Sequence, residues 1–170
     1  MLHAMKSIFA ILATIAILSP LSALAAGPLP IGPNKGVYGD WTAAAYGSGA
    51  SKICYAFTKP QSTSPVLARR GLAMLTVTER HGSHDEVSVT PGYIYPAHAV
   101  ITMQLGRNKL PFYVQDNVAF TDAVSEALTG FAAQSITSVT ATGPRGKKLT
   151  DSFSLTGFSA AYKAIEKACP

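Results

Sequence analysis

Residues 151–169, DSFSLTGFSAAYKAIEKAC, carry a strand pattern and a helix pattern on either side of Gly157. Before this glycine the side chains alternate, with Phe153 and Leu155 on one face and serine or threonine on the other, which is typical of a half-buried strand. After it, Ser159 can cap the first turn of a helix, and the apolar residues recur at helical spacing. These residues are Phe158, Ala161, Tyr162, Ile165, Ala168 and Cys169. Because so short an amphipathic helix is marginally stable alone, we expect it to dock on a β-rich body.

The chain contains two cysteines, Cys54 in an apolar segment and Cys169 at the end of the predicted helix. An even number of cysteines in an exported protein favours a disulfide. Such a bond would close a loop over most of the domain and, in the chain-entropy account, contribute about 4–5 kcal/mol to stability. The alternative is a pair of free thiols. We expect the bond to hold the last helix against an early strand.

Residues 1–25 have the features of a secretory signal peptide. Lys6 provides a positive charge, residues 8–18 form an apolar run, and residues 23–25, ALA, form a small-x-small cleavage site. The apolar run is too short to predict a transmembrane helix, and no later segment is apolar enough to span a bilayer. We therefore expect cleavage after this leader and a periplasmic or secreted protein that does not span a membrane.

The rest of the chain fits one domain, residues 37–170, preceded by an extended segment over residues 26–36 that is rich in glycine and proline. The whole chain has 14 Lys and Arg and nine Asp and Glu, and removal of Lys6 with the leader leaves 13 against nine, a net charge of +4. This mild excess permits attraction to anionic lipids or glycans. Charges so little clustered do not favour nucleic acid as a partner.

Short segments of alternating apolar residues, separated by turn residues, recur along the domain. We predict strands over residues 36–45, 53–57, 71–79, 86–90, 101–105, 110–114, 135–142 and 149–155. One interior helix is predicted over residues 121–128 with Gly130 as its stop, and the prolines of residues 59–65 argue against regular pairing there. Trp41, the only tryptophan, is expected to anchor the core. The pattern predicts a mainly β fold, a β-sandwich with one short interior helix and a C-terminal helix.

Several short motifs occur in the same order as in one family of exported proteins. They are GDW (39–41), KICYA (52–56), RG (70–71), EVSV (86–89), GY (92–93), RG (145–146), DSFSLTGFSAA (151–161) and Cys169. Through these motifs the chain resembles the invasion-associated locus B family of alphaproteobacteria. The resemblance implies an immunoglobulin-like β-sandwich, export to the periplasm or envelope, and, as for the founding members, a contribution to invasion of host cells. It implies no catalytic residues.

The chain departs from the family pattern in two places. Longer members often carry a second cysteine pair, which residues 112–120 do not supply. Many relatives also have a tryptophan where Ala119 and Phe120 stand. The resemblance is therefore to a short branch with one disulfide, and a role in envelope maintenance is expected beside the role in invasion.

The sequence offers little that would support catalysis. His81, His84, Asp85 and Glu86 form the one cluster of metal-ligand side chains, but they lie in a predicted turn without an identifiable distant ligand, and we expect a solvated turn and no metal. There is no nucleophile motif such as Gly-x-Ser-x-Gly, and no phosphate-binding loop. His98 is expected at the surface. We predict no catalytic residues and no cofactor; the alternative is an uncharacterised periplasmic enzyme or metal-binding protein.

Two surfaces remain as candidates for binding. Arg145, Lys147 and Lys148, at a predicted turn, form a basic tip that Arg69 and Arg70 could join. Such a tip would attract anionic sugars or lipid headgroups. The alternative is an ordinary solvated hairpin.

The second surface is the bend PGYIYP, residues 91–96, which we expect to display Tyr93 and Tyr95. Their rings could stack on a glycan or enter a protein interface, or instead pack over the open end of the sandwich. Together with the leader and the lack of catalytic motifs, these two candidate surfaces predict an exported, non-catalytic binding protein. Its expected partner is an envelope or host-surface protein, a glycan or an anionic lipid.

Overall fold

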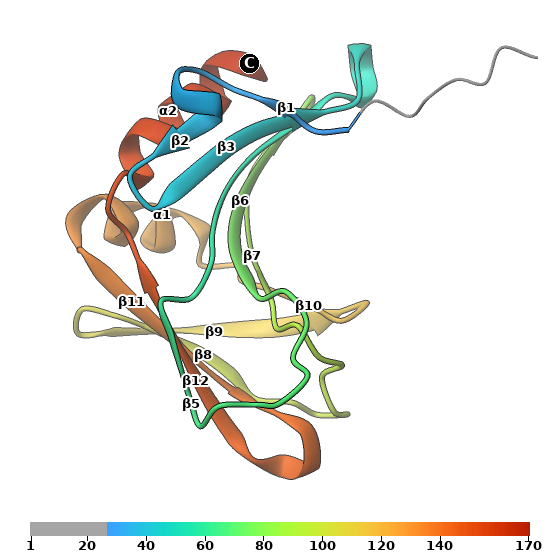
Figure 1. Ribbon diagram of the computed structural model, residues 1–170, viewed down its shortest axis with the longest axis vertical. Coiled ribbons are helices and arrows are strands. Elements are labelled where there is room, and N and C mark those ends of the chain that lie inside the picture. Colours follow the sequence, from blue (N-terminus) through green and yellow to red (C-terminus); the bar gives the residue numbers. More distant parts are fainter. Residues whose placement is uncertain (1–26) are drawn as a thin grey trace, which may run out of the picture.

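The computed structural model describes residues 27–170, without the side chain of His84. The predicted signal peptide, residues 1–25, lies outside this part of the chain. Within the described part, twelve strands form one open sheet with antiparallel pairings, and two α-helices pack against it (Figure 1). The expected class, mainly β with one interior helix and one C-terminal helix, is confirmed.

The elements have the following bounds. The strands are β1 (Leu29–Pro30), β2 (Val37–Tyr38), β3 (Trp41–Tyr46), β4 (Ile53–Thr58), β5 (Ser62–Ser64), β6 (Met74–Arg80), β7 (Ser83–Thr90), β8 (Ile101–Leu105), β9 (Asn108–Gln115), β10 (Val118–Phe120), β11 (Ile136–Thr142) and β12 (Lys148–Ser154). The α-helices are α1 (Val124–Ala133) and α2 (Phe158–Ala168). Three short 3-10 helices are η1 (Asn34–Gly36), η2 (Gly49–Ser51) and η3 (Pro144–Gly146).

The long strand β9 joins the two halves of the sheet. The strand order is β1-β3-β4-β6-β7-β10-β9-β8-β11-β12-β5, with β2 paired to β3. The first part of β9, up to Phe112, pairs with β8, and its last part, from Tyr113, pairs with β10. Side chains from both halves meet in one hydrophobic core. The sheet therefore packs on itself in the manner of a β-sandwich.

Trp41 connects the sheet to both helices. Its side chain is fully buried at the start of β3, and its indole N–H donates to the carbonyl oxygen of Ser154 at 3.0 Å. Its ring centroid lies 5.0 Å from that of Phe158 in α2 and 6.3 Å from that of Phe131 in α1. The predicted role of this tryptophan as a core anchor is confirmed.

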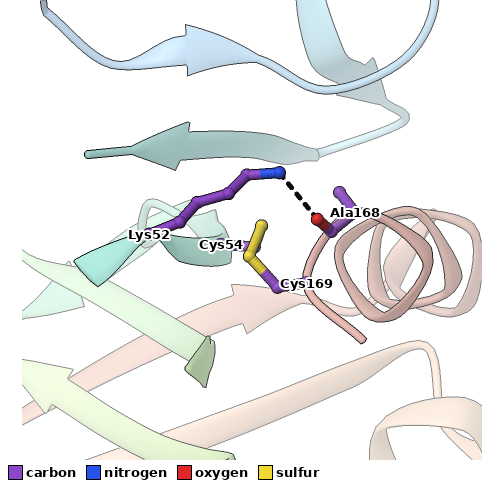
Figure 2. Close-up of a disulfide and its surroundings, with 4 residues drawn as sticks. All are labelled: Lys52, Cys54, Ala168 and Cys169. Carbon is purple, nitrogen blue, oxygen red and sulfur yellow. Dashed lines mark hydrogen bonds between the residues drawn. A yellow bond between two sulfur atoms is a disulfide. The ribbon is translucent and has the colours of Figure 1, made fainter. Parts of the chain in front are cut away.

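The C-terminal helix docks on β3 and β4 and is covalently attached there, as predicted. Cys54 of β4 and Cys169 form a disulfide, with 5.9 Å between their Cα atoms (Figure 2). Beside it, the Lys52 ammonium donates to the carbonyl oxygen of Ala168 at 2.7 Å (Figure 2). Because lysine can satisfy one of the free carbonyls at a helix C-terminus, this contact caps α2 as well as holding it.

The start of α2 differs from the prediction. Its N-cap residue is Gly157 and not Ser159, and no side chain caps the helix. Gly157 has a φ of +91°, and a Cβ there would lie 1.9 Å from the carbonyl oxygen of Tyr38. A glycine is needed at this position because the backbone is left-handed and another backbone segment lies against it.

The strands β2 and β5 correct two further predictions. The single strand expected over residues 36–45 is divided into β2 and β3, which form a tight hairpin around Gly39 with its φ of +59°. The segment over residues 59–65 was expected not to pair, yet β5 pairs with β12. Pro60 and Pro65 lie outside the three residues of β5, so they do not interrupt its hydrogen bonds.

The interior helix also differs in its bounds. It begins at Val124 and continues through Gly130, which was expected to stop it. A Cβ at Gly130 would lie 2.1 Å from the Leu105 side chain. The glycine therefore serves the close approach of α1 to β8 and does not end the helix.

Candidate functional site

The predicted basic hairpin is present between β11 and β12. Its tip is η3, and the backbone N–H of Gly143 donates to the carbonyl oxygen of Lys147 at 2.7 Å, which closes the turn. Arg145, Lys147 and Lys148 are all exposed. In the described part of the chain no ion pair engages these three side chains. Their positive charge therefore faces solvent.

The β5–β6 loop, residues 65–73, lies beside this hairpin. It follows β5, in which Ser64 pairs with Thr150 of β12. Since the two strands are antiparallel, the loop begins near the start of β12, where Lys148 lies. Figure 1 shows this loop and the β11–β12 hairpin together at the lower end of the molecule.

The β7–β8 loop, residues 91–100, extends from the β5–β6 loop to the hairpin. The backbone N–H of Gly71 donates to the carbonyl oxygen of Gly92 at 2.7 Å, and that of Thr142 donates to the carbonyl oxygen of Val100 at 3.0 Å. A Cβ at Gly92 would lie 2.4 Å from the Gly71 carbonyl oxygen, so glycine is required where the two loops touch. Two loops and one hairpin, far apart in sequence, thus form one end of the fold.

A buried ion pair holds these segments together. Arg70 of the β5–β6 loop donates from Nη1 to Oδ1 of Asp151 at 2.6 Å and from Nη2 to Oδ2 at 2.5 Å. The Thr63 hydroxyl donates to the same Oδ1 at 2.7 Å, and Arg70 Nε donates to the carbonyl oxygen of Pro91 at 2.6 Å. One guanidinium therefore connects the β5–β6 loop, β12 and the β7–β8 loop. We call the Arg70–Asp151 pair with these contacts the arginine clasp.

The clasp corrects one expectation about charge. Arg70 was a candidate to join the basic surface, but its side chain is only 10% exposed and that of Asp151 only 8%. The hydrogen bond with Asp151 raises the pKa of Arg70 above its usual value, although burial opposes this shift. The charge of Arg70 is thus neutralised inside the fold, whereas Arg69 is exposed.

The two tyrosines of the predicted bend fill the space around the clasp. The Arg70 guanidinium lies 5.5 Å from the centroid of the Tyr93 ring, and the rings of Tyr93 and Tyr95 are perpendicular with centroids 5.6 Å apart. Tyr95 is 7% exposed, and its hydroxyl has no protein partner in the described structure. The expectation that the bend displays both rings is therefore wrong for Tyr95, and Tyr93 is half-buried.

The β9–β10 turn closes the same end of the fold. The side-chain oxygen of Asn117 accepts from the backbone N–H of Tyr95 at 2.7 Å, and its Nδ2 donates to the carbonyl oxygen of Tyr93 at 3.0 Å. Burial raises the pKa of Tyr95 well above the usual tyrosine value, and burial also raises that of Tyr93. Both rings are therefore neutral at physiological pH, and this interior is polar without a free charge.

Outside this polar interior, the loops present aliphatic side chains. We define the loop-end surface as these side chains together with the neighbouring exposed cations. Its residues are Val66, Arg69, Leu72, Ile94, Val100, Arg145, Lys147 and Lys148. Sequence reasoning found the cations, because they are adjacent at a predicted turn. It missed the aliphatic residues, because they are isolated in two loops and form no periodic pattern.

Two acidic side chains of the histidine-containing turn are engaged by other protein groups. Glu86 pairs with Arg80 at 2.7 Å, and Asp85 accepts a hydrogen bond from the Tyr162 hydroxyl of α2. His81 is exposed. Among residues 27–170, setting aside the side chain of His84, no group of three or more His, Cys, Asp and Glu is arranged to hold a metal ion.

A small acidic cleft lies beside the disulfide. It has a volume of about 290 Å³ and is lined by Glu79, Asp85, Tyr162, Glu166, Cys169 and Pro170. Burial raises the pKa of Tyr162, and the hydrogen bond to Asp85 raises it further. Tyr162 therefore keeps its proton and donates a hydrogen bond to Asp85, so that this side chain already has a partner.

His98, which was predicted to lie at the surface, is exposed in the β7–β8 loop.

The described part of the chain has no helix that is both long and apolar enough to cross a membrane. Comparison with family models, with curated proteins and with solved structures finds no match to this chain.

Proposed function

We propose that this chain is an exported, non-catalytic binding protein of the cell envelope or of a host-facing surface, and that it binds through the loop-end surface. One observation carries the proposal. The cations of the β11–β12 hairpin are exposed and without ion pairs among the described residues, while Asp151 at the same end is already neutralised by Arg70. A surface with this charge attracts anionic partners over several ångströms through water.

Two further observations support the setting. The Cys54–Cys169 disulfide is compatible with an oxidising compartment outside the cytoplasm. The sequence motifs that resemble the invasion-associated locus B family point to the periplasm or the cell surface. On this proposal the protein contributes to host-cell invasion or to maintenance of the envelope.

The proposal is tested by binding of the purified protein to isolated bacterial envelopes and to host-cell surfaces at increasing salt. We expect binding to weaken as ionic strength rises, because the attraction is electrostatic. The triple variant R145A/K147A/K148A is expected to bind about ten- to a hundredfold more weakly, since each cation near an anionic surface contributes about 1 kcal/mol.

A matched control removes the same charge elsewhere. Lys35 of η1 and Lys163 and Lys167 of α2 are exposed, and α2 lies at the end of the molecule opposite the hairpin (Figure 1). The variant K35A/K163A/K167A should bind nearly as well as the wild type. Equal losses in the two triple variants, or no loss in the hairpin variant, would contradict the proposal.

A further inference from the structure

The loop-end surface contains four exposed large aliphatic residues. Val66 in the β5–β6 loop is 87% exposed, and Ile94 and Val100 in the β7–β8 loop are 81% and 69% exposed. Leu72, near the contact between the two loops, is 54% exposed. Single apolar residues are common on protein surfaces, but four in two loops that contact each other through Gly71 and Gly92 call for an explanation, and we call these four residues the patch.

The interior of this end explains why these side chains are outside. The space between the loops is filled by Arg70, Asp151, Tyr93 and Tyr95, which pair with one another or with backbone groups. If an aliphatic side chain such as Val66 entered this space, it would separate Arg70 from Asp151. Each charge would then be buried without a partner, which is strongly unfavourable. An ion pair and two tyrosines thus occupy the space between the loops, and the four aliphatic side chains remain on the surface.

The surroundings of the patch indicate what covers it. Arg69 adjoins it in the β5–β6 loop, and the hairpin with Arg145, Lys147 and Lys148 is hydrogen-bonded to the backbone of Val100. Aliphatic side chains at loop tips beside exposed cations match an anionic bilayer, where the tips reach the acyl boundary and the cations meet phosphates. A sulfated polysaccharide would use the cations but would gain little from the aliphatic residues.

We propose that the loop-end surface docks on the surface of an anionic phospholipid bilayer, with Val66 and Ile94 entering the interface between headgroups and acyl chains. This inference rests on the proposed function and names its partner. The arginine clasp holds the loops in position before contact, so that little conformational entropy is lost on binding. The protein then lies on the membrane without spanning it.

The test measures partitioning onto vesicles of phosphatidylcholine with and without phosphatidylglycerol. We expect binding only to the vesicles that contain phosphatidylglycerol. The variant V66S/I94S keeps every charge and should bind these vesicles at least about tenfold more weakly, because the apolar surface buried at the interface is lost. The control L29S/V37S removes exposed aliphatic residues, 64% and 46% exposed, from β1 and β2, and should bind as the wild type does.

A second measurement reports insertion directly. Trp41 is fully buried and is the only tryptophan, so its emission provides a constant background. In the variant V66W the added indole should shift to shorter wavelength on vesicles that contain phosphatidylglycerol, and brominated lipids should quench it. No shift and no quenching in vesicle-bound V66W would overturn the inference.

The remaining outcomes separate this inference from the proposed function. If V66S/I94S binds the vesicles as tightly as the wild type while R145A/K147A/K148A does not bind, the contact is purely electrostatic and the insertion is wrong. If heparin, and not the vesicles, is bound through the hairpin, the partner is a polyanionic glycan; the inference fails and the proposed function stands. If the hairpin variant binds envelopes, host surfaces and vesicles as the wild type does, both fail.

Discussion

Arg70 shows how one buried side chain organises an end of this molecule. Its guanidinium reaches Asp151, which is 81 residues away in sequence, and the carbonyl oxygen of Pro91. Taking both charges out of water has a large desolvation cost, which the bidentate geometry and the added hydrogen bond from Thr63 offset. Such a pair is sensitive to the loss of either partner.

We expect Asp151→Asn to lower the free energy of unfolding by about 3–5 kcal/mol, because it leaves the Arg70 charge buried without a counterion. The control is Glu86→Gln, which breaks the Arg80–Glu86 pair, whose side chains are 42% and 35% exposed. This pair is largely solvated, so the control should cost less than about 1 kcal/mol. Urea denaturation of both variants measures the difference, and similar costs would show that the clasp contributes little.

Tyr95 gives a prediction about alkaline pH. Burial raises its pKa above the ordinary value of 10.0, so the folded protein keeps a proton that the unfolded chain releases. The stability linked to this proton is complete below about pH 10 and is lost as the pH rises toward the folded-state pKa. Tyr95→Phe should therefore make the fall in unfolding free energy above pH 10 less steep.

At neutral pH the same variant should be as stable as the wild type or slightly more stable, because the Tyr95 hydroxyl is buried without a protein partner in the described structure. Tyr162→Phe is the comparison. It should also reduce the alkaline slope, since the pKa of Tyr162 is raised by burial, but it should cost about 1 kcal/mol at neutral pH because the hydrogen bond to Asp85 is lost. Denaturation curves at several pH values check both results; an unchanged slope in Tyr95→Phe would contradict the assignment.

At the scale of the elements, α2 depends on its attachment. The helix has 11 residues, too few to be stable alone in water, and buries Phe158, Ala161 and Ile165 against the sheet. The disulfide spans 115 residues of sequence. We expect C54A/C169A to lower the free energy of unfolding by about 4–5 kcal/mol, in the chain-entropy account of loop closure.

Denaturation followed by the fluorescence of Trp41 measures this loss of stability, because the Trp41 ring packs against Phe158 of α2. The control Lys52→Ala removes only the hydrogen bond to the carbonyl oxygen of Ala168 and should cost about 1 kcal/mol. A double cysteine variant no less stable than Lys52→Ala would mean that packing alone holds the helix.

The elements that sequence reasoning found are those with a local pattern. The β12–α2 unit alternates and then changes period within a few residues of Gly157, so both elements could be predicted. The strands β5 and β10 have three residues each, and a window of that length holds no periodicity. Gly130 was misread as a stop because its role is the contact with Leu105 of β8, which no local signal reveals.

The same distinction applies to the candidate site. The hairpin cations could be predicted because a turn and three basic residues lie together in the chain. The burial of Arg70 could not, since it depends on Asp151 in a strand that is paired with β5. The contact between the β5–β6 loop, with Val66, and the β7–β8 loop, with Ile94, could not be inferred either, because it depends on how the two loops meet in space.

At the scale of the whole molecule, β12 separates the basic hairpin from α2. This strand starts at the basic hairpin and ends shortly before α2, and its seven residues span roughly 20 Å at about 3.3 Å per residue. The acidic cleft, with Glu166, lies on α2 at the far end. The hairpin end has exposed cations without ion pairs among the described residues, and this orients the molecule on approach to an anionic surface.

Asp116 and Glu166 test this orientation, because replacing either residue by its amide removes one negative charge. Asp116 is exposed in the β9–β10 turn, where the adjacent Asn117 is hydrogen-bonded to the β7–β8 loop. Glu166 is exposed on α2, roughly one strand length from the basic hairpin. The Debye length is about 8 Å at physiological ionic strength and about 30 Å at 0.01 M. We therefore expect Asp116→Asn to strengthen binding to phosphatidylglycerol vesicles at both salt concentrations, and Glu166→Gln to strengthen it only at the lower one. Sedimentation with vesicles measures both, and equal gains at physiological salt would mean that net charge, and not the loop-end surface, governs the contact.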